Sequence, residues 1–214
     1  VDAEPKRKIE EEPDAGAKVD RLAAALEMAR PDVILAIGPL TNLAALLNAG
    51  ASLPHLAIMG GKLQDMMLPG MLPNIPEWNW FCDPVSVQVV LDAKHATLPR
   101  IIPAEVTFAT QLDDGDVSLL SEGDALAQML SKLSTVWLDV LRTSISKAPP
   151  RIALHDPLTA ATLVEPSLCH FEERRIEVDG VGASRPARGP DNIEAAIDVD
   201  NAALRDHLMK TWLP

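Results

Sequence analysis

A short segment, residues 73–84, combines polar and aromatic side chains in a pattern that could bind a ligand. Its sequence is Pro-Asn-Ile-Pro-Glu-Trp-Asn-Trp-Phe-Cys-Asp-Pro. In an extended segment alternate side chains point the same way, so we expect Glu77 and Asn79 to face one side and Trp78 and Trp80 the other. A carboxylate accepts hydrogen bonds, and an amide donates and accepts them, which suits a ligand rich in hydroxyls. A loop with core tryptophans and solvated polar residues fits the pattern equally well.

The triplet His155-Asp156-Pro157 is the second group of residues that could carry chemistry. Histidine titrates near neutral pH, and a carboxylate is a good ligand for a hard cation, so the pair could combine a proton donor with a metal ligand. The alternative is structural, with Asp156 capping a helix and His155 packed beside it. The other histidines are scattered along the chain and suggest no cluster.

The composition limits the classes of function. The chain has 214 residues and a formal net charge of −12, which argues against nucleic acid and anionic membrane surfaces as partners. Its two cysteines, Cys82 and Cys169, lack metal-ligand spacing, so we expect a reducing compartment and a cytoplasmic location. We find no apolar run of membrane-spanning length, no signal peptide, no phosphate-binding glycine fingerprint and no serine nucleophile elbow.

The hydrophobic pattern of the first half predicts alternating helices and strands. Residues 1–16 are charged and are expected to be mobile, and a helix is expected over 17–29. Apolar runs at 33–37 and 55–59 predict buried strands, with a helix over 43–48 that Thr41 or Asn42 caps. This alternation predicts an α/β fold with a mostly parallel sheet, in which ligands bind outside the carboxyl ends of the strands.

The second half continues the pattern. Asp83-Pro84 is a strong helix start, and strands are expected over 97–102, 171–178 and 193–199. Residues 113–123 are expected to form a solvated acidic loop, followed by a long amphipathic helix over 124–146 whose apolar stripe we assign to the core. A helix opens at His155, and a terminal helix capped by Asp200 or Asn201 ends near Trp212. We see no domain boundary and expect a single domain.

Taken together, the motifs resemble the inosine-uridine-preferring nucleoside hydrolases. Leu-Ala-Ile-Gly-Pro-Leu-Thr-Asn-Leu at 35–43 is followed by Ile-Met-Gly-Gly at 58–61, Pro-Glu-Trp-Asn at 76–79 with Asp-Pro at 83–84, and His-Asp-Pro at 155–157. The resemblance extends from about Val19 to Trp212. It implies a Rossmann-like open, mostly parallel sheet with flanking helices, of which this chain is a C-terminal portion.

The resemblance also implies an activity. The family hydrolyses the N-glycosidic bond of ribonucleosides with a calcium ion at the carboxyl edge of the sheet, a role in purine or pyrimidine salvage. It implies that Asp156 binds calcium and the ribose hydroxyls, and that Ile37 offers its backbone carbonyl to the metal. Glu77 and Asn79 resemble the ribose-binding pair. Met59 resembles a methionine that lines the sugar site, and His155 a histidine near the base.

The chain departs from the family pattern at several places. The N-terminal signature Asp-x-Asp-Pro-Gly-x-Asp-Asp, which supplies most calcium carboxylates and the general base, is not found here. Met71 stands where many members carry a ribose-contacting asparagine, and Asn74 is the nearest candidate to replace it. Phe108 stands where members often have histidine, and residues 183–192 look shortened.

The missing aspartates bear directly on activity. Asp156 and one carbonyl are a poor site for a cation that takes six to eight oxygens, so we expect a weak or inactive enzyme that needs a missing segment, a partner chain or homo-oligomerisation. One alternative is a non-catalytic nucleoside- or ribose-binding or interaction protein on the same scaffold. Another is a truncated product, which an exposed sheet edge and aggregation would reveal.

Overall fold

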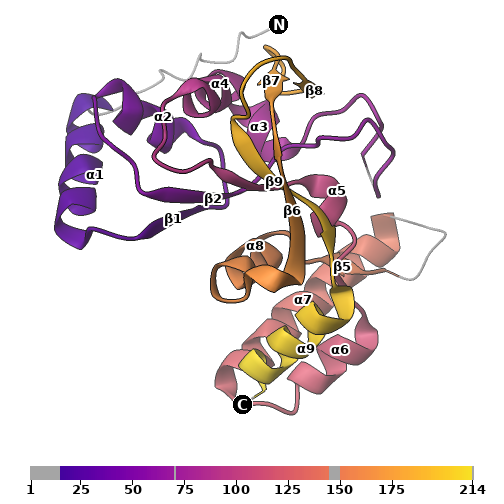
Figure 1. The fold of residues 1–214 in the computed structure, drawn as a ribbon. Coiled ribbons are helices and arrows are strands. Elements are labelled where there is room, and N and C mark those ends of the chain that lie inside the picture. Colours follow the sequence, from indigo (N-terminus) through magenta and orange to yellow (C-terminus); the bar gives the residue numbers. More distant parts are fainter. Residues whose placement is uncertain (1–14, 70, 145–149, 214) are drawn as a thin grey trace, which may run out of the picture.

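A five-stranded sheet forms the centre of the molecule. The computed structural model describes residues 15–69, 71–144 and 150–213. Residues 1–14 of the segment that is expected to be mobile therefore lie outside the described part. The strands run in the order β1, β2, β3, β9, β6, and the first four are parallel while β6 is antiparallel to β9 (Figure 1). Their bounds are Val33–Ala36 (β1), His55–Met59 (β2), Arg100–Ile102 (β3), Ile193–Val199 (β9) and Cys169–Arg174 (β6).

Helices cover both faces of this sheet, and a helical group extends away from it (Figure 1). Beside β1 to β3 lie α1 (Ala15–Ala29), α2 (Thr41–Asn48), α3 (Trp78–Cys82) and α4 (Pro84–Asp92). The others are α5 (Ala104–Thr107), α6 (Asp114–Leu120), α7 (Ala125–Ser144), α8 (His155–Val164), the short η1 (Pro166–Leu168) and α9 (Asn201–Trp212). Two small antiparallel pairs join β4 (Gln111–Leu112) to β5 (Ile152–Ala153) and β7 (Ile176–Val178) to β8 (Ser184–Pro186).

Two apolar clusters lie on opposite faces of the sheet. Neighbouring residues of β9 show this directly, because Ala195 belongs to the cluster with α2 and α4, and Ala196 to the cluster with α8 and α9. Alternate residues of a strand point to opposite faces, and a parallel sheet buried on both sides is made of continuous apolar runs. The expected α/β architecture with a mostly parallel sheet is confirmed.

Individual elements agree with the sequence to different degrees. The strands over 55–59 and 193–199 have the predicted bounds, and the Asp83-Pro84 helix start is confirmed by α4. The predicted cap of α2 is wrong, because Thr41 lies inside the helix and its hydroxyl donates to Asp83 instead. The predicted strand over 171–178 is two strands, β6 and β7, that belong to different sheets.

The acidic segment over 113–123 was predicted to be a loop, and this is wrong for most of its length. Asp113 accepts hydrogen bonds from the backbone N–H groups of Gly115 and Asp116, at 2.9 and 3.1 Å, and the Asp116 carboxylate accepts one from Asp113 N at 3.1 Å. This reciprocal capping box starts α6. Acidic side chains at a helix N-terminus satisfy otherwise unpaired N–H groups, so the charge favours this helix.

The apolar stripe of α7 was assigned to the core, and this is also wrong. Leu126, Met129, Leu133, Trp137 and Val140 are all exposed. The buried face of α7 is formed by Ala127, Ser131 and Leu138 instead. Small residues on that face allow α7 to lie close to α6, and Ser131 Oγ donates to the carbonyl of Val117 at 2.8 Å. The strongest apolar period of this helix therefore marks its outer side.

Candidate active site

The turn after β2 is the first part of the site. Met59 ends β2 at the carboxyl edge of the sheet and is buried, with 4% of its surface exposed. Gly60 and Gly61 follow, and the indole of Trp80 lies directly over them. A Cβ on Gly61 would lie 2.7 Å from the Trp80 ring, and Gly61 has a φ of +78° that favours glycine. The two glycines are therefore required for the close approach of Trp80.

Glu77 connects this turn to α3. It is the N-cap of α3: its Oε1 accepts from Asn79 N at 2.8 Å, and its Oε2 accepts from Trp80 N at 3.2 Å and from Gly61 N at 3.1 Å. Burial raises the pKa of Glu77 above its usual range, backbone hydrogen bonds oppose that rise, and the nearby charge of Asp156 adds to it. The Glu77 carboxylate thus organises the site's frame as well as lining it.

Asn79 completes a cluster with Met59 and Glu77. Its Nδ2 donates to Met59 O at 3.2 Å and contacts Met59 Sδ at 3.5 Å. Glu77 and Asn79 do come together, but the predicted extended geometry is wrong because the segment turns into α3. The two tryptophans consequently do not share one side: Trp78 is 68% exposed and Trp80 is fully buried.

Asp83 holds the neighbouring helices in place. Its carboxylate accepts from Ser86 N at 3.1 Å, from Ser86 Oγ at 2.6 Å and from Thr41 Oγ1. Burial raises the pKa of Asp83, but the hydrogen bonds from Ser86 and Thr41 outweigh it, so the pKa lies below its usual range. The Thr41 and Asp83 motifs, 42 residues apart, therefore fix α2 against α4.

His155 is the first residue of α8 and lies against residues 107 and 108. Its Nδ1 is 2.6 Å from Thr107 Oγ1, and its ring meets the Phe108 ring edge-on, with centroids 4.7 Å apart. Burial lowers the pKa of His155. Thr107 Oγ1 also donates its single proton to Ala104 O at 3.1 Å, so the network is satisfied when the Nδ1–H of His155 donates to Thr107. In the neutral imidazole, Nε2 then carries the lone pair.

Asp156 follows in the first turn of α8 and differs from Glu77. Its side chain is partly buried, and burial raises its pKa. Within the described residues, no protein group hydrogen-bonds its carboxylate. The structural alternative of a capping Asp156 is wrong, because Leu154 occupies the N-cap position. The charge of Asp156 contributes to the raised pKa of Glu77, which links Asp156 to the Met59, Glu77 and Asn79 cluster.

Ile37 and Asn74 are two further candidates named from the sequence. Ile37 follows β1 at the same edge of the sheet, and 47% of the residue's surface is exposed. Asn74 is exposed in a loop and lines a separate hollow of about 230 Å³ with Lys62 and Ser184. The hydrogen bonds that join Met59, Glu77 and Asn79 do not include Asn74.

The described residues do not form a complete metal site. Among residues 15–69, 71–144 and 150–213, no group of three or more histidine, cysteine, aspartate or glutamate side chains could hold a metal ion. Calcium takes six to eight oxygens, whereas this edge of the sheet offers the free carboxylate of Asp156 and the carbonyl of Ile37. The residues present therefore fit only part of a calcium site.

Sequence reasoning missed three parts of the site. Thr107, the partner of His155, follows a predicted strand end, a position that could have marked it. Glu105 accepts from Leu63 N at 2.9 Å, and its other oxygen is buried without a hydrogen-bond partner in the described structure. Gly182, at the tip of the β7–β8 hairpin, has a φ of +88°, and a Cβ there would lie 2.6 Å from the carbonyl oxygen of Trp80. No local sequence pattern indicated that last contact.

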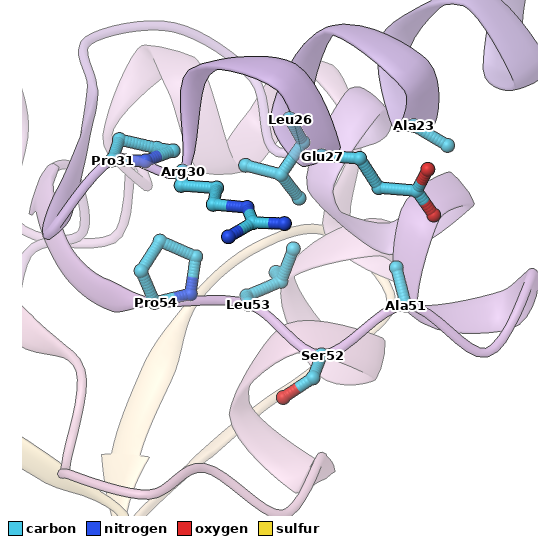
Figure 2. A pocket seen from close by; sticks show the side chains of 9 residues that line it. All are labelled: Ala23, Leu26, Glu27, Arg30, Pro31, Ala51, Ser52, Leu53 and Pro54. Atoms are coloured by element: carbon cyan, nitrogen blue, oxygen red, sulfur yellow. The ribbon is translucent and has the colours of Figure 1, made fainter.

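A larger hollow lies away from this site. Figure 2 shows it between the end of α1 and residues 51–54, with Arg30 and Glu27 on its rim and a volume of about 400 Å³. Pro31 and Pro54 stand just before β1 and β2, so this hollow is at the amino-terminal ends of the strands. Ligands of open α/β sheets bind at the opposite edge, which favours the cluster around Met59 and Asp156.

Comparisons with known proteins agree with the motifs. A family model described as inosine-uridine preferring nucleoside hydrolase matches residues 2–206. The chain is 28% identical over 180 residues to the pyrimidine-specific ribonucleoside hydrolase RihA of Salmonella paratyphi B, which covers 79% of this chain and 54% of the relative. The RihA protein of Salmonella typhi matches to the same extent. The chain thus spans about half the length of the curated relatives it matches.

Solved structures show the same fold. A plant nucleoside hydrolase superposes with a TM-score of 0.78 at 22% identity, covering 91% of this chain and 66% of that one. A purine-preferring ribonucleoside hydrolase from Gardnerella vaginalis gives a TM-score of 0.76 at 20% identity, with 94% of this chain and 66% of the other covered. In the part of the chain that the structure describes, no helix is both long and apolar enough to cross a lipid bilayer.

Proposed function

The chain belongs to the inosine-uridine preferring nucleoside hydrolase family, and from this premise we propose that it serves the hydrolysis of a ribonucleoside to ribose and free base. One observation carries the proposal. Met59, Glu77 and Asn79 are joined by hydrogen bonds at the carboxyl edge of the sheet, and Asp156 is near enough to act electrostatically on Glu77. A polar cluster at that edge matches the position at which open α/β sheets bind ligands.

The proposed ribose contact of each residue follows from the hydrogen-bonding atoms that it has not already used within the protein. Asp156 has an unpaired carboxylate in the described structure and is proposed to accept hydrogen bonds from ribose hydroxyls. Asn79 uses its Nδ2 on Met59, which leaves Oδ1 for a hydroxyl. Glu77 Oε1 accepts a single backbone N–H and can accept one more hydrogen bond. Met59 supplies an apolar contact for the sugar. Asn74 is proposed as a further ribose contact, supported by its sequence position.

His155 is proposed to act at the leaving base. Hydrolysis breaks the bond between the anomeric carbon and the base nitrogen; water supplies a hydroxyl to the carbon, and the base takes up a proton. With Nδ1 donating to Thr107, Nε2 is the ring atom that can carry that proton to the base. The lowered pKa keeps most of His155 neutral at pH 7, so only the protonated fraction acts as acid. Carboxylates nearby stabilise the oxocarbenium-like transition state.

We propose calcium as the cofactor of the complete site, with Asp156 and the carbonyl of Ile37 as the donors that this chain contributes. When bound, calcium lowers the pKa of a coordinated water and orients the sugar diol. Because the described residues supply only part of the oxygen shell, the 214-residue chain alone is proposed to be an impaired hydrolase.

The decisive experiment is titration calorimetry of the chain with calcium and with ribose, followed by hydrolysis assays on inosine and uridine. The proposal expects ribose binding that Asp156→Asn weakens, with slow or no hydrolysis. Asp206→Asn is the matched control, since Asp206 lies on α9 and contacts Lys210. Ribose binding that is unchanged in Asp156→Asn would contradict the site. Tight calcium binding with rapid turnover by the chain alone would contradict the impairment.

A second candidate function is non-catalytic binding of a ribonucleoside. The incomplete metal site favours it, because the Met59, Glu77 and Asn79 cluster does not depend on a metal for its hydrogen bonds. This candidate predicts nucleoside binding that is insensitive to calcium and is not followed by hydrolysis.

Three broader proposals accompany the function. A single domain is supported by the two apolar clusters that share one sheet. A cytoplasmic location is supported by two free cysteines, Cys82 and Cys169, which suit a reducing compartment. A homo-oligomer is supported by exposed apolar surface on α7.

A further inference from the structure

A hollow of about 360 Å³ lies at the edge of the sheet opposite to the candidate active site. Its walls are the end of α4, the residues that precede β3 and β9, and the residue before β7. The hollow is therefore at the amino-terminal ends of the parallel strands, whereas Met59 ends β2 at the carboxyl edge. Pockets of a few hundred Å³ are the size at which proteins bind small molecules.

Basic side chains outnumber carboxylates around this hollow, although the chain as a whole has a formal net charge of −12. The titratable side chains that line it are Lys94, His95, Arg175, Arg188, Asp92 and Asp191. Of its lysine and arginine side chains, only Arg175 has an ion-pair partner among the described residues. The charge that gathers here therefore favours an anion as the ligand.

Arg175 is more buried than Lys94 and Arg188, and its charge is poorly compensated. Its side chain is 27% exposed, and its Nη2 is 3.6 Å from Asp92 Oδ1, which is longer than a hydrogen bond. Its Nε is buried and has no hydrogen-bond partner among the described residues. Burying a charged group costs free energy unless it is paired and hydrogen-bonded. An anion in the hollow would offset that cost.

The walls of the hollow are held together without using the cationic groups. Asn192 is buried, and its Nδ2 donates to Leu91 O at 3.4 Å and to Ile176 O at 3.1 Å. Its Oδ1 accepts from Ile176 N at 3.0 Å, so one amide joins the end of α4 to the start of β7. The N–H of Ala187 donates to Arg175 O at 3.0 Å. A site that is formed before the ligand arrives spends less of the binding energy on ordering.

A phosphate group on a small organic molecule is the anion that fits these features. Guanidinium groups bind phosphate through several charge-assisted hydrogen bonds, and more than one cation suits its double charge. Pockets of this size hold ligands larger than a phosphate ion, and Leu98 and Pro99 offer apolar contacts for an organic group. A nucleic acid is disfavoured, because its many phosphates would be repelled by the acidic surface of the chain.

We propose that this hollow binds a phosphate monoester of a small molecule, with Arg175 and Arg188 on the phosphate oxygens and Lys94 adding positive charge. Leu98 and Pro99 contact the organic group. The site is independent of the proposed activity, because it uses none of the residues that are proposed to contact the ribose or the base.

Titration calorimetry of the 214-residue chain, in a phosphate-free buffer of low ionic strength, tests the ligand. The probes are phenyl phosphate, inorganic phosphate and phenol. We expect one site per chain for phenyl phosphate, weaker binding of inorganic phosphate and no binding of phenol. If inorganic phosphate binds as tightly as phenyl phosphate, the assignment to a monoester is wrong. If neither phosphate binds at concentrations up to about 10 mM, the site itself is wrong.

Arginine substitutions test the position of the site. Arg175→Gln should raise the Kd of phenyl phosphate about tenfold or more, and the exposed Arg188→Gln about three- to tenfold. Arg185→Gln is the matched control, since it removes the same charge from β8, where Arg185 pairs with Glu177 at 3.3 Å, and should change the Kd less than about twofold. Urea denaturation verifies that each variant is folded. Equal weakening in Arg185→Gln and Arg188→Gln would overturn the proposal.

Asp92→Asn provides a test of opposite sign, which a loss of folding cannot imitate. The carboxylate of Asp92 competes with the ligand for Arg175, so its removal should lower the Kd of phenyl phosphate about three- to tenfold. Asp206→Asn removes the same charge from α9, where Asp206 contacts Lys210, and should lower the Kd less than about twofold. An effect of Asp92→Asn no larger than that of Asp206→Asn would overturn the assignment of Arg175 to the phosphate.

Discussion

Two carboxylates of the candidate site, Glu77 and Asp156, have opposite relations to the protein around them. Glu77 accepts three backbone hydrogen bonds, from Gly61, Asn79 and Trp80, and so joins β2 to α3. Asp156 accepts none from the described residues. Both have a pKa raised by burial, but only Glu77 recovers part of that cost through backbone N–H groups.

The difference separates a residue that holds the site together, Glu77, from one whose carboxylate is left available for a ligand, Asp156. Removing a side chain that satisfies several buried donors affects folding, whereas removing one that only faces the ligand space affects binding. Motif reasoning treated the two carboxylates alike, as ligand-contacting groups. The structure gives Glu77 a second role that the motif did not reveal, and four measurements can test the contrast.

The largest effect is expected for Glu77→Ala. It leaves two buried N–H groups and one partly buried N–H group without their acceptor and removes the N-cap of α3, so we expect a loss of about 3–5 kcal/mol in the free energy of unfolding. Urea denaturation measures it. The stability of Glu77→Gln should lie between those of the parent chain and Glu77→Ala, because the amide keeps the shape of the side chain but offers one acceptor oxygen. A loss below about 1 kcal/mol for Glu77→Ala would remove the basis of the contrast.

Gly61→Ala should destabilise the same frame by about 2–4 kcal/mol, since the new methyl group meets the Trp80 ring and the residue has a positive φ. Gly38→Ala is the matched control at the end of β1, where a Cβ would meet nothing within 4 Å. Thermal unfolding of both variants measures the difference. Equal melting temperatures for the two variants would contradict the close packing of Trp80 on this turn.

Asp156→Asn should show the reverse behaviour. We expect its stability to stay within about 0.5 kcal/mol of the parent chain or to rise slightly, because the burial cost of the charge is removed. Ribose binding, measured by calorimetry, should weaken about tenfold, which is about 1.4 kcal/mol. A large loss of stability would show that Asp156, like Glu77, supports the frame.

The smallest effect is a pH dependence that comes from His155. Its pKa is lowered in the folded chain, so below about pH 6.5 the unfolded state takes up a proton before the folded state does. Falling pH should therefore reduce stability in the window between 6.5 and the lowered folded pKa. The raised pKa values of Glu77 and Asp156 act in the opposite direction. The contribution of His155 is the difference in unfolding free energy between the parent chain and His155→Asn, measured by urea denaturation over this pH range. Identical pH profiles for the two chains would contradict the prediction.

The sequence predicted the fold well where one physical signal dominated. The apolar run of β2 and the mainly apolar sequence of β9 favour buried strands, and Asp83-Pro84 is a local helix start, so these elements were predicted with their positions. The prediction of a loop over 113–123 was wrong because the acidic side chains were assumed to be solvated. The same carboxylates cap α6, and only the backbone geometry distinguishes these two roles.

The site was predicted by residue identity more than by geometry. Met59, Glu77, Asn79 and His155–Asp156 were all named from motifs, and the structure joins the first three through hydrogen bonds. The bond from His155 to Thr107 crosses 48 residues, and no local pattern encodes it. The role of Trp80 was missed because an alternating pattern cannot show that the segment becomes helical at a glutamate cap.

Helix α7 shows why periodicity alone does not place a core. Its large residues follow a helical period, yet the buried side is the one with Ala127 and Ser131. Small residues let helices approach closely, so the inner side of a helix can be less apolar than the outer one. An amphipathic period indicates that a helix has an apolar face, but it does not show whether that face packs on the protein's own core.

The hairpin between β7 and β8 has an evolutionary consequence. Surface turns usually drift freely in sequence and length. Here Gly182 lies against the backbone of Trp80, while two residues earlier Gly180 has open space around it. Lineages of this protein can therefore vary residue 180 at little cost, but a mutation that gives residue 182 a side chain displaces α3 and the Glu77 cap with it. Selection on the proposed ribose site would thus extend to a hairpin tip outside the Met59, Glu77 and Asn79 cluster.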